Sequence, residues 1–134
     1  MQRKVFVFVL HNCTHPGCTH PAVTMFDKNG EIDMAHSLCL EHCENAQEVK
    51  NAIFNYIAQH DKIIALNAPG ITFSDMDFSG KKFYGCNFQH CNFFNINSEN
   101  CRIRISMFDF ATFADCNMIK SNWQFVSYAG STLS

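Results

Sequence analysis

The sequence predicts a small α/β domain followed by an all-β solenoid. The first observation behind this prediction is a period of five, because from position 71 onward nearly every fifth residue is large and apolar. The second is a pair of Cys- and His-containing motifs within the first 62 residues. A period of five matches neither the 3.6-residue repeat of a helix nor the two-residue repeat of a flat strand. It indicates a solenoid, whose units bury their apolar faces only by stacking.

Each five-residue unit has two inward positions. The large position is held in order by Phe73, Phe78, Phe83, Phe88, Phe93, Ser98, Ile103, Phe108, Phe113, Met118, Trp123, Tyr128 and Leu133. Two residues earlier lies a smaller residue, which in four units is Cys86, Cys91, Cys101 or Cys116. A free Cys in such a place acts as a small apolar side chain, so we interpret these four as core residues. Ser98 at a large position and Lys81 at a small position predict irregular coils at both.

Two consecutive units show the repeat most clearly. They read Gly85-Cys86-Asn87-Phe88-Gln89 and His90-Cys91-Asn92-Phe93-Phe94. On these residues the segment 71–134 resembles the pentapeptide-repeat family, whose unit is small, Asn or Asp, Leu or Phe, polar, polar. The resemblance implies an all-β right-handed quadrilateral β-helix with one repeat on each side and twenty residues in each coil. The segment would then form about three and a quarter coils, roughly 15 Å tall at ~4.8 Å between paired strands.

Twenty residues per coil would place equivalent residues in columns. The expected columns are Phe73, Phe93, Phe113 and Leu133; Phe88, Phe108 and Tyr128; and Phe83, Ile103 and Trp123. Buried rings contribute about 25 cal/mol per Å² of apolar area, so these columns are expected to supply most of the stability.

The composition is that of an intracellular globular protein. The chain has 134 residues, a net charge of −2 and 47% apolar residues. It has no run of about eighteen apolar residues that would cross a membrane. The short apolar run Val5–Leu10 is followed by His and Cys rather than a cleavage site, which favours an N-terminal strand over a signal peptide. Of the eight Cys, four hold core positions and four have metal-ligand spacing, so we expect a reducing, cytoplasmic location.

The N-terminal segment carries two ligand motifs. Cys13 and Cys18 bracket a Pro-Gly turn, and twenty residues later Cys39 and His42 stand three apart. Thiolate and imidazole are the ligands that zinc takes in closed tetrahedral sites. We therefore predict a structural Zn²⁺ at Cys13, Cys18, Cys39 and His42. Cys43 is an alternative fourth ligand, and His36 could approach from the hairpin.

The interval between the motifs reads as a β-hairpin. Its strands are expected over 22–26 and 31–35 and are joined by a turn through Asn29-Gly30. A helix follows, with apolar residues at helical spacing from Ala46 to Ile57, and Cys39 and His42 are expected at its start. This order resembles the treble-clef class of zinc fingers over residues 11–60. The expected domains are a treble-clef-like zinc-binding domain with a C-terminal helix over 1–62, a linker or cap over 63–70, and the β-helix over 71–134.

No motif predicts catalysis. Four good ligands close the expected zinc site, whereas a catalytic zinc needs an open position and a nearby base. A phosphate loop, a catalytic triad and the deaminase signature are absent from the sequence. His11, His15 and His20 flank the first motif and are interpreted as exposed polar residues. The sequence therefore predicts that the protein is not an enzyme.

The solenoid surface is the expected functional part. The repeat register places cations, aromatic residues and an apolar corner on one side: Lys82, Tyr84, Arg102, Arg104, Ile105 and Phe125. Exposed apolar residues beside Arg and Tyr are typical of contact surfaces. We therefore predict a protein-interaction module whose partner is a protein of unknown identity.

Two alternative functions involve nucleic acid. The family resemblance implies that some members mimic duplex DNA and modulate DNA gyrase or topoisomerase. Five acids and five cations balance in residues 71–134, and the rod is short, so no effect on supercoiling is expected. A nucleic-acid-binding zinc finger is the other alternative. It is disfavoured because residues 1–62 carry five cations against seven acids and no basic stripe.

The last coil is expected to need a cover. Trp123, Tyr128 and Leu133 lie in it without a following helix or charged segment. An uncovered coil exposes core and unpaired strand edges to water. We therefore expect an end-to-end homodimer through these residues, with a bound protein partner as the alternative.

Overall fold

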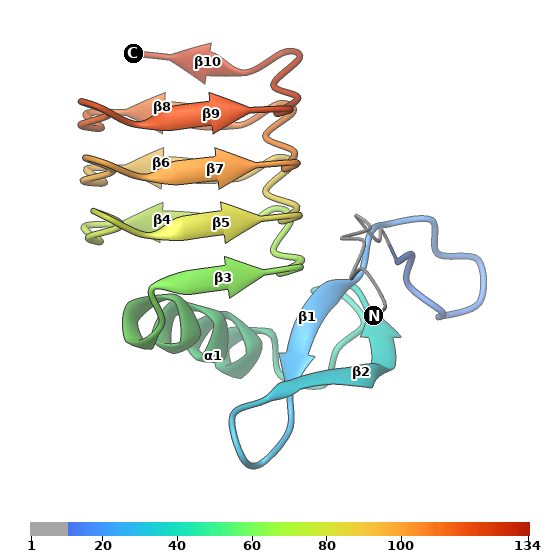
Figure 1. Ribbon diagram of the computed structural model, residues 1–134. Coiled ribbons are helices and arrows are strands. Elements are labelled where there is room, and N and C mark those ends of the chain that lie inside the picture. The colour runs from blue at the N-terminus through green and yellow to red at the C-terminus, as the bar shows by residue number, and fades with distance from the viewer. Residues whose placement is uncertain (1–10) are drawn as a thin grey trace, which may run out of the picture.

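The computed structural model describes residues 11–134, and the strand expected over Val5–Leu10 lies outside them. A two-stranded antiparallel hairpin, β1 (Val23–Phe26) and β2 (Ile32–Leu38), is followed by helix α1 (Ala46–Gln59). The rest of the chain is a solenoid of stacked parallel strands (Figure 1). Over the described range, no helix has the length and apolarity needed to cross a membrane.

Two parallel four-stranded sheets form opposite sides of the solenoid. The first contains β3 (Lys62–Ile64), β5 (Lys82–Tyr84), β7 (Arg102–Arg104) and β9 (Asn122–Gln124) in that order. The second contains β4 (Thr72–Ser74), β6 (Asn92–Phe94), β8 (Thr112–Ala114) and β10 (Thr132–Leu133).

Every strand lies in register with the strand twenty residues away. Phe83 stands opposite Ile103 in the first sheet, and Phe73 opposite Phe93 in the second. Isolated parallel bridges such as Asn87 to Met107 and Asn97 to Asn117 complete the other two sides at the same spacing. The four-sided solenoid with a period of twenty is therefore confirmed.

The corners explain the polar part of the repeat. Every fifth residue from 65 to 130 has positive φ, and eight of these fourteen corners are Gly, Asn or Asp, which adopt that conformation most readily. Before each corner, an Asn or Asp side chain often accepts a hydrogen bond from the backbone N–H two residues on. The Oδ1 atoms of Asp77, Asn87 and Asn117 accept in this way at 2.9–3.0 Å. Such Asx turns hold the chain in the bend.

The core is a stack of aromatic rings. Phe73 lies 5.3 Å from Phe93 between ring centroids, and Phe93 lies 4.9 Å from Phe113, with nearly parallel planes in both pairs. Phe88 and Phe108 continue a second column at 5.2 Å. The predicted aromatic columns are thus confirmed, and their contact spacing is that of favourable ring pairs.

The repeat cysteines also lie in this core. Cys86 and Cys91 are fully buried, and burial raises the pKa of both thiols to about 12. The thiols of Cys91 and Cys101 donate to the carbonyls of Ala68 and Phe78, at 2.9 and 2.7 Å. A thiol held protonated and out of solvent is unreactive, so these residues serve packing.

The solenoid begins earlier than the sequence suggested. Residues 63–70 are not a linker, because β3 pairs with β5 and the Ala68 N–H donates to the Asn87 carbonyl at 2.8 Å. Ile63 and Leu66 are fully buried. The segment therefore supplies part of an additional coil, which extends the solenoid to four levels.

Helix α1 covers the lower end of the solenoid (Figure 1). Its residues Ile53 and Ile57 are fully buried in the same cluster as the first coil, and Phe54 meets Phe73 edge to face at 5.4 Å. Asn45 caps the helix, since its side chain accepts from the Glu48 N–H at 3.2 Å. The helix thus supplies the apolar layer that a terminal coil requires.

The irregular coils expected at Lys81 and Ser98 are not found. Lys81 is buried because it lies directly above the start of the solenoid, where its ammonium group donates to the His60 carbonyl at 2.7 Å and lies 4.0 Å from Asp61. The backbone around Ser98 keeps its bridges to the coils on both sides. Side-chain size therefore does not set the register, because the backbone ladder holds it.

Ser98 lines a cavity of about 20 Å³ in the core, together with Phe78, Phe108, Trp123 and other core residues. We predict that Ser98→Leu raises the free energy of unfolding by about 1 kcal/mol, because it places apolar atoms where the other columns carry them. Thermal denaturation would report the change. Ser106→Leu is the control and should destabilise, since the Ser106 hydroxyl accepts from Cys86 N–H at 3.1 Å and donates to the Arg104 carbonyl at 2.9 Å. A lower melting temperature for Ser98→Leu would contradict the prediction.

Candidate metal centre

The structure brings Cys13, Cys18, Cys39 and His42 together. Their ligand atoms all lie within 4.8 Å of one another. The Sγ atoms of Cys18 and Cys39 are 3.8 Å apart, and His42 Nδ1 lies 3.5 Å from Cys13 Sγ and 3.2 Å from Cys39 Sγ. A tetrahedron with metal–sulfur bonds of ~2.3 Å and metal–nitrogen bonds of ~2.0 Å requires S···S distances of about 3.8 Å and S···N distances of about 3.5 Å. The four side chains are therefore spaced as ligands of one ion.

The first ligand motif is held by backbone hydrogen bonds. The Cys13 N–H donates to the His20 carbonyl at 2.8 Å, and the Cys18 N–H donates to the His15 carbonyl at 3.0 Å. Gly17 turns the loop with a φ of 81°. This closed loop aims both sulfur atoms toward the same point despite the four residues between them.

The second motif lies in a turn rather than on the helix. Cys39 directly follows β2, and the N–H of His42 donates to its carbonyl at 3.1 Å. Helix α1 begins only at Ala46. The expected position at the helix start is therefore wrong, because the Asn45 cap sets the first helical turn after both ligands.

The structure places His42, and not Cys43, among the four. The Cys43 thiol instead donates to the Leu40 carbonyl at 3.3 Å, and burial raises its pKa. The side chain of His36, the other alternative ligand, lies outside the described part of the chain.

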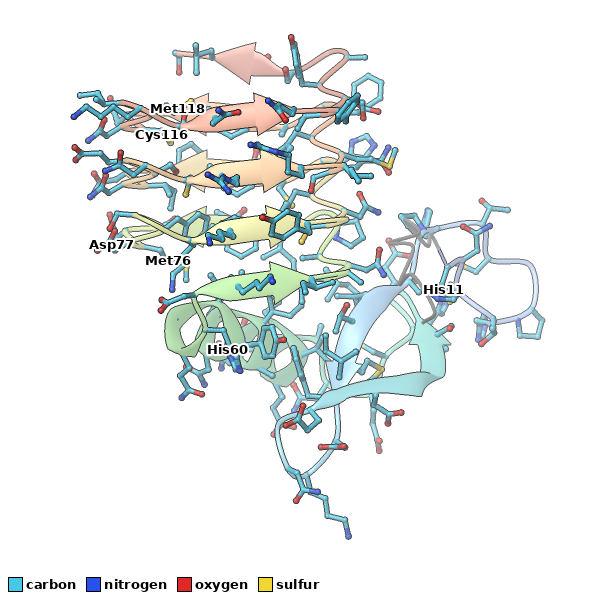
Figure 2. The ribbon with its side chains drawn as sticks, in the orientation of Figure 1. His11, His60, Met76, Asp77, Cys116 and Met118 are labelled. Carbon is cyan, nitrogen blue, oxygen red and sulfur yellow. The ribbon has the colours of Figure 1, made fainter. Side chains whose placement is uncertain are left out.

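The three histidines around the first motif differ from one another. His15 is exposed and stacks on the His42 ring at 3.9 Å, and exposed His20 has Nδ1 3.8 Å from a Glu41 carboxylate oxygen. His11 was expected to be exposed but is half-buried, with Nε2 buried; it lies beside the hairpin (Figure 2). Of these three, His15 bears directly on the cluster, because its stacking on His42 restricts the orientation of the His42 imidazole ring.

The thiols of the cluster ionise unequally. Burial opposes ionisation of Cys13, but hydrogen bonds at Cys39, His15 and His42 outweigh it and lower its pKa to about 6. For Cys18 a hydrogen bond at the His20 backbone favours the thiolate, yet burial and the neighbouring thiols raise the pKa overall. Cys13 thus ionises more readily than Cys18, and a bound cation would favour the thiolate at both residues. Protons should accordingly compete with the metal as the pH falls.

The donor set describes a closed site. Three thiolates and one imidazole fill the four positions of a tetrahedral ion and leave none for a reacting water. All eight cysteines are free of disulfides, so the three thiols of the cluster are available to bind. The arrangement can hold a metal ion and thereby join the first loop to the turn before α1.

Comparison with models of known protein families, with curated proteins and with solved structures found no match.

The residues predicted for an interaction surface lie on the first sheet and its corner. Lys82 and Arg102 are exposed, and Tyr84 and Arg104 are half-buried on the same outer face. At the corner beside them, Ile105 is 38% and Phe125 83% exposed.

Two further residues of this face, Lys62 and Ile64 on β3, are exposed and were not predicted from the sequence. A signal was present, since Ile63 stands twenty residues before Phe83. It was obscured because the next unit carries Leu66 at the small position and Ala68 at the large one, which reverses the repeat.

The three residues predicted for a homodimer end differ in exposure. Trp123 is half-buried, with its ring 4.8 Å from Phe108. Tyr128 and Leu133 are 61% and 73% exposed. In the last coil, core positions thus become increasingly open to solvent.

We predict one metal ion per chain, lost in Cys39→Ser and retained in Cys43→Ser. The first change removes a ligand of the closed set, whereas the second alters a thiol that lies outside the cluster and donates to the Leu40 carbonyl. Elemental analysis of purified protein measures the stoichiometry, and cobalt substitution followed by visible absorption reports tetrahedral thiolate ligation. Less than about half an equivalent in the unmodified protein, or equal metal content in the two variants, would contradict the ligand set.

Proposed function

We propose that this chain is a non-enzymatic, zinc-stabilised β-solenoid protein that acts as a protein-interaction module. The observation that carries the proposal is the outer face of the first sheet, where cations and Tyr84 adjoin an exposed apolar corner of Ile105 and Phe125. Apolar and aromatic residues with Arg are the usual composition of contact surfaces. The closed donor set of the metal centre supports a structural and not a catalytic metal.

Zinc is the metal that fits the donors best. Three soft thiolates with one imidazole favour it over hard cations such as Mg²⁺ and Ca²⁺, and it imposes no geometry beyond the tetrahedron. The order of knuckle, hairpin, second ligand pair and helix supports a treble-clef-like finger. Eight free thiols further support a reducing compartment such as the cytoplasm.

The metal would act on function through helix α1. His42 is separated from the start of the helix by three residues. The buried residues of the helix pack in the same hydrophobic cluster as those of the first coil of the solenoid. A small N-terminal segment buries little apolar area, so metal binding would contribute much of its folding free energy. Zinc would thereby hold helix α1 in the position in which it covers the lower end of the solenoid.

The interaction function is tested by affinity capture from the native host with paired variants. One bait carries Lys82→Glu with Arg102→Glu on the proposed face, and the control carries Thr72→Glu with Thr112→Glu on the opposite sheet. We expect a protein captured by the unmodified bait and by the control to be lost from the first variant, because charge reversal at an interface is repulsive. Mass spectrometry identifies the captured proteins. A capture pattern that is the same for all three baits would refute this face as the docking surface.

We also propose that a second copy covers the last coil. Tyr128 and Leu133 are exposed at core positions there. The strand β10 pairs with β8 on one side only. A symmetric contact between two such ends would pair like surfaces and close upon itself.

The dimer is tested by light scattering on the unmodified protein and on Leu133→Arg with Tyr128→Glu. We expect a dimeric mass for the first at tens of micromolar and a monomeric mass for the second, because two charged side chains would replace the apolar contact and would lose hydration on dimerisation. Circular dichroism should show the same fold for both. A monomeric mass for the unmodified protein would refute the dimer.

A further inference from the structure

The outer face of the first sheet carries four cations in two columns. Strand pairing sets Lys62 beside Lys82 and Lys82 beside Arg102, so that this column rises by one strand spacing, about 4.8 Å, at each step. The neighbouring column contains Ile64, Tyr84, Arg104 and Gln124. Of the eight outward residues on these four strands, none is acidic, in a chain whose net charge is −2.

Acidic residues surround this face on its flanks. Asp77 and Glu99 belong to the side of the solenoid that precedes it, and Asp109 belongs to the side that follows. In Figure 2, Asp77 lies at one margin of the sheet. The positive surface is therefore a strip about one three-residue strand wide, roughly 10 Å.

The fold does not require these charges. The opposite sheet is built in the same way, and its outward residues are uncharged: Thr72, Asn92, Thr112 and Thr132 in one column, and Ser74, Phe94, Ala114 and Ser134 in the other. Like charges directly opposite one another on paired strands are destabilising. Repulsion between the cations thus lowers the stability of the first sheet, and the opposite sheet carries no such repulsion.

The apolar corner beside the strip costs stability as well. Ile105 and Phe125 have φ of 51° and 54°, a left-handed conformation that is strained for branched and bulky residues. In the same column Gly85 makes the bend without strain. Three unfavourable features therefore occur together here: apolar side chains exposed to solvent, a strained left-handed backbone, and cations stacked on paired strands. Such features concentrate at functional sites.

We propose that the strip formed by Lys62, Lys82, Arg102 and Arg104 binds an extended acidic segment of a partner protein, with an apolar side chain of that segment against Ile105 and Phe125. This proposal rests on the protein-interaction function above and specifies the chemical class of the partner. Carboxylates would remove the repulsion between the stacked cations and complete their hydrogen bonding.

The spacing of the cations matches such a segment. Arg102 and Arg104 are two residues apart on one strand, so their outward positions are about 6.7 Å apart. An extended peptide with acids at alternate positions presents carboxylates at the same interval. The Arg104 guanidinium is already oriented, because its Nη1 donates to the carbonyls of Ile103 and Asn122 at 3.0 and 2.9 Å. Within residues 11–134 its other N–H groups have no hydrogen-bond acceptor, so they can bind an anion.

The flanking acids favour a peptide over a nucleic acid. A long polyanion wider than the strip would extend over Asp77 and Glu99 on one side and Asp109 on the other, and its phosphates would be repelled. An extended segment of about three residues that runs parallel to the strands, as the match to Arg102 and Arg104 requires, spans roughly 10 Å and stays within the strip. Lys62 Nζ lies 5.8 Å from the Tyr84 ring centroid, so a cation and an aromatic ring are adjacent on this face.

The test uses a short labelled peptide with Glu at alternate positions and one Phe, and a matched peptide with Gln in place of Glu. Fluorescence anisotropy at low ionic strength measures their binding to the full chain. The charge variant combines Lys62→Gln, Lys82→Gln and Arg102→Gln. The control variant combines Lys28→Gln, Lys50→Gln and Lys120→Gln, which removes the same charge from residues outside the strip. Single-stranded and duplex DNA oligonucleotides are the competing probes.

We expect the Glu peptide to bind and the Gln peptide not to bind. The charge variant should bind the Glu peptide roughly tenfold more weakly, and the control variant should bind it unchanged. The charge variant should also melt a few degrees higher at low salt, because repulsion is relieved, and that increase should vanish at high salt. Equal weakening in both variants, or DNA bound more tightly than the Glu peptide, would overturn the proposal.

A second pair of substitutions tests the corner. Ile105→Asn and Phe125→Asn place a residue that tolerates positive φ at each bend. We expect weaker binding of the Glu peptide together with unchanged or higher thermal stability. Lower stability with unchanged binding would assign the corner to the fold and overturn its role as an anchor.

The outcome also separates this inference from the interaction function itself. If a host protein is lost from the variant with Lys82→Glu and Arg102→Glu but the Glu peptide does not bind, the acidic-segment proposal fails and the interaction function stands. If the Glu peptide binds the strip but no host protein depends on this face, the interaction function fails as stated.

Discussion

The parallel backbone ladder that sets each residue beside the one twenty positions away is the constraint on which the rest of the structure depends. It stacks Phe73, Phe93 and Phe113 into one aromatic column, and it equally stacks Lys62, Lys82 and Arg102 into a column of cations. Stacking is favourable for the first set and unfavourable for the second. The same geometry therefore produces both the aromatic core that stabilises the solenoid and the column of cations whose repulsion destabilises it. The left-handed corner at every fifth residue is the second requirement of the ladder, and the sequence meets it only in part.

The N-terminal region and the solenoid are joined by a continuous series of contacts. The cluster of Cys13, Cys18, Cys39 and His42 lies across the first loop and the turn before α1. The helix shares a core with the first coil, and β1 is hydrogen-bonded to that coil as well. The Thr24 N–H donates to the Asn67 carbonyl and the Asn67 N–H to the Thr24 hydroxyl, both at 2.7 Å. Lys81 adds a hydrogen bond from the first full coil to the end of α1. The two parts therefore share one hydrophobic core, and a metal ion bound at the cluster would act on the solenoid through these contacts.

Cysteine serves two distinct physical roles in this chain. In the solenoid it is a buried small side chain whose pKa is raised by desolvation, as at Cys86. At the metal centre hydrogen bonds lower the pKa of Cys13 to about 6, although it too is buried. Local hydrogen bonding thus decides between an inert thiol and a potential metal ligand. Spacing in the sequence separated these two groups correctly because one follows the five-residue period and the other does not.

The sequence by itself determined the solenoid, the hairpin, the helix and the four residues of the metal cluster, because each depends on a local pattern: a period, an Asn-Gly turn, or closely spaced ligands. Tertiary structure decided what depends on neighbours far along the chain. Residues 63–70 join the solenoid because β5 pairs with β3, although Leu66 and Ala68 reverse the repeat. Ser98 and Lys81 keep a regular backbone because the adjacent coils and the end of α1 hold it. The basic strip likewise exists only when coils are stacked, since its four cations lie on three strands separated by twenty residues each.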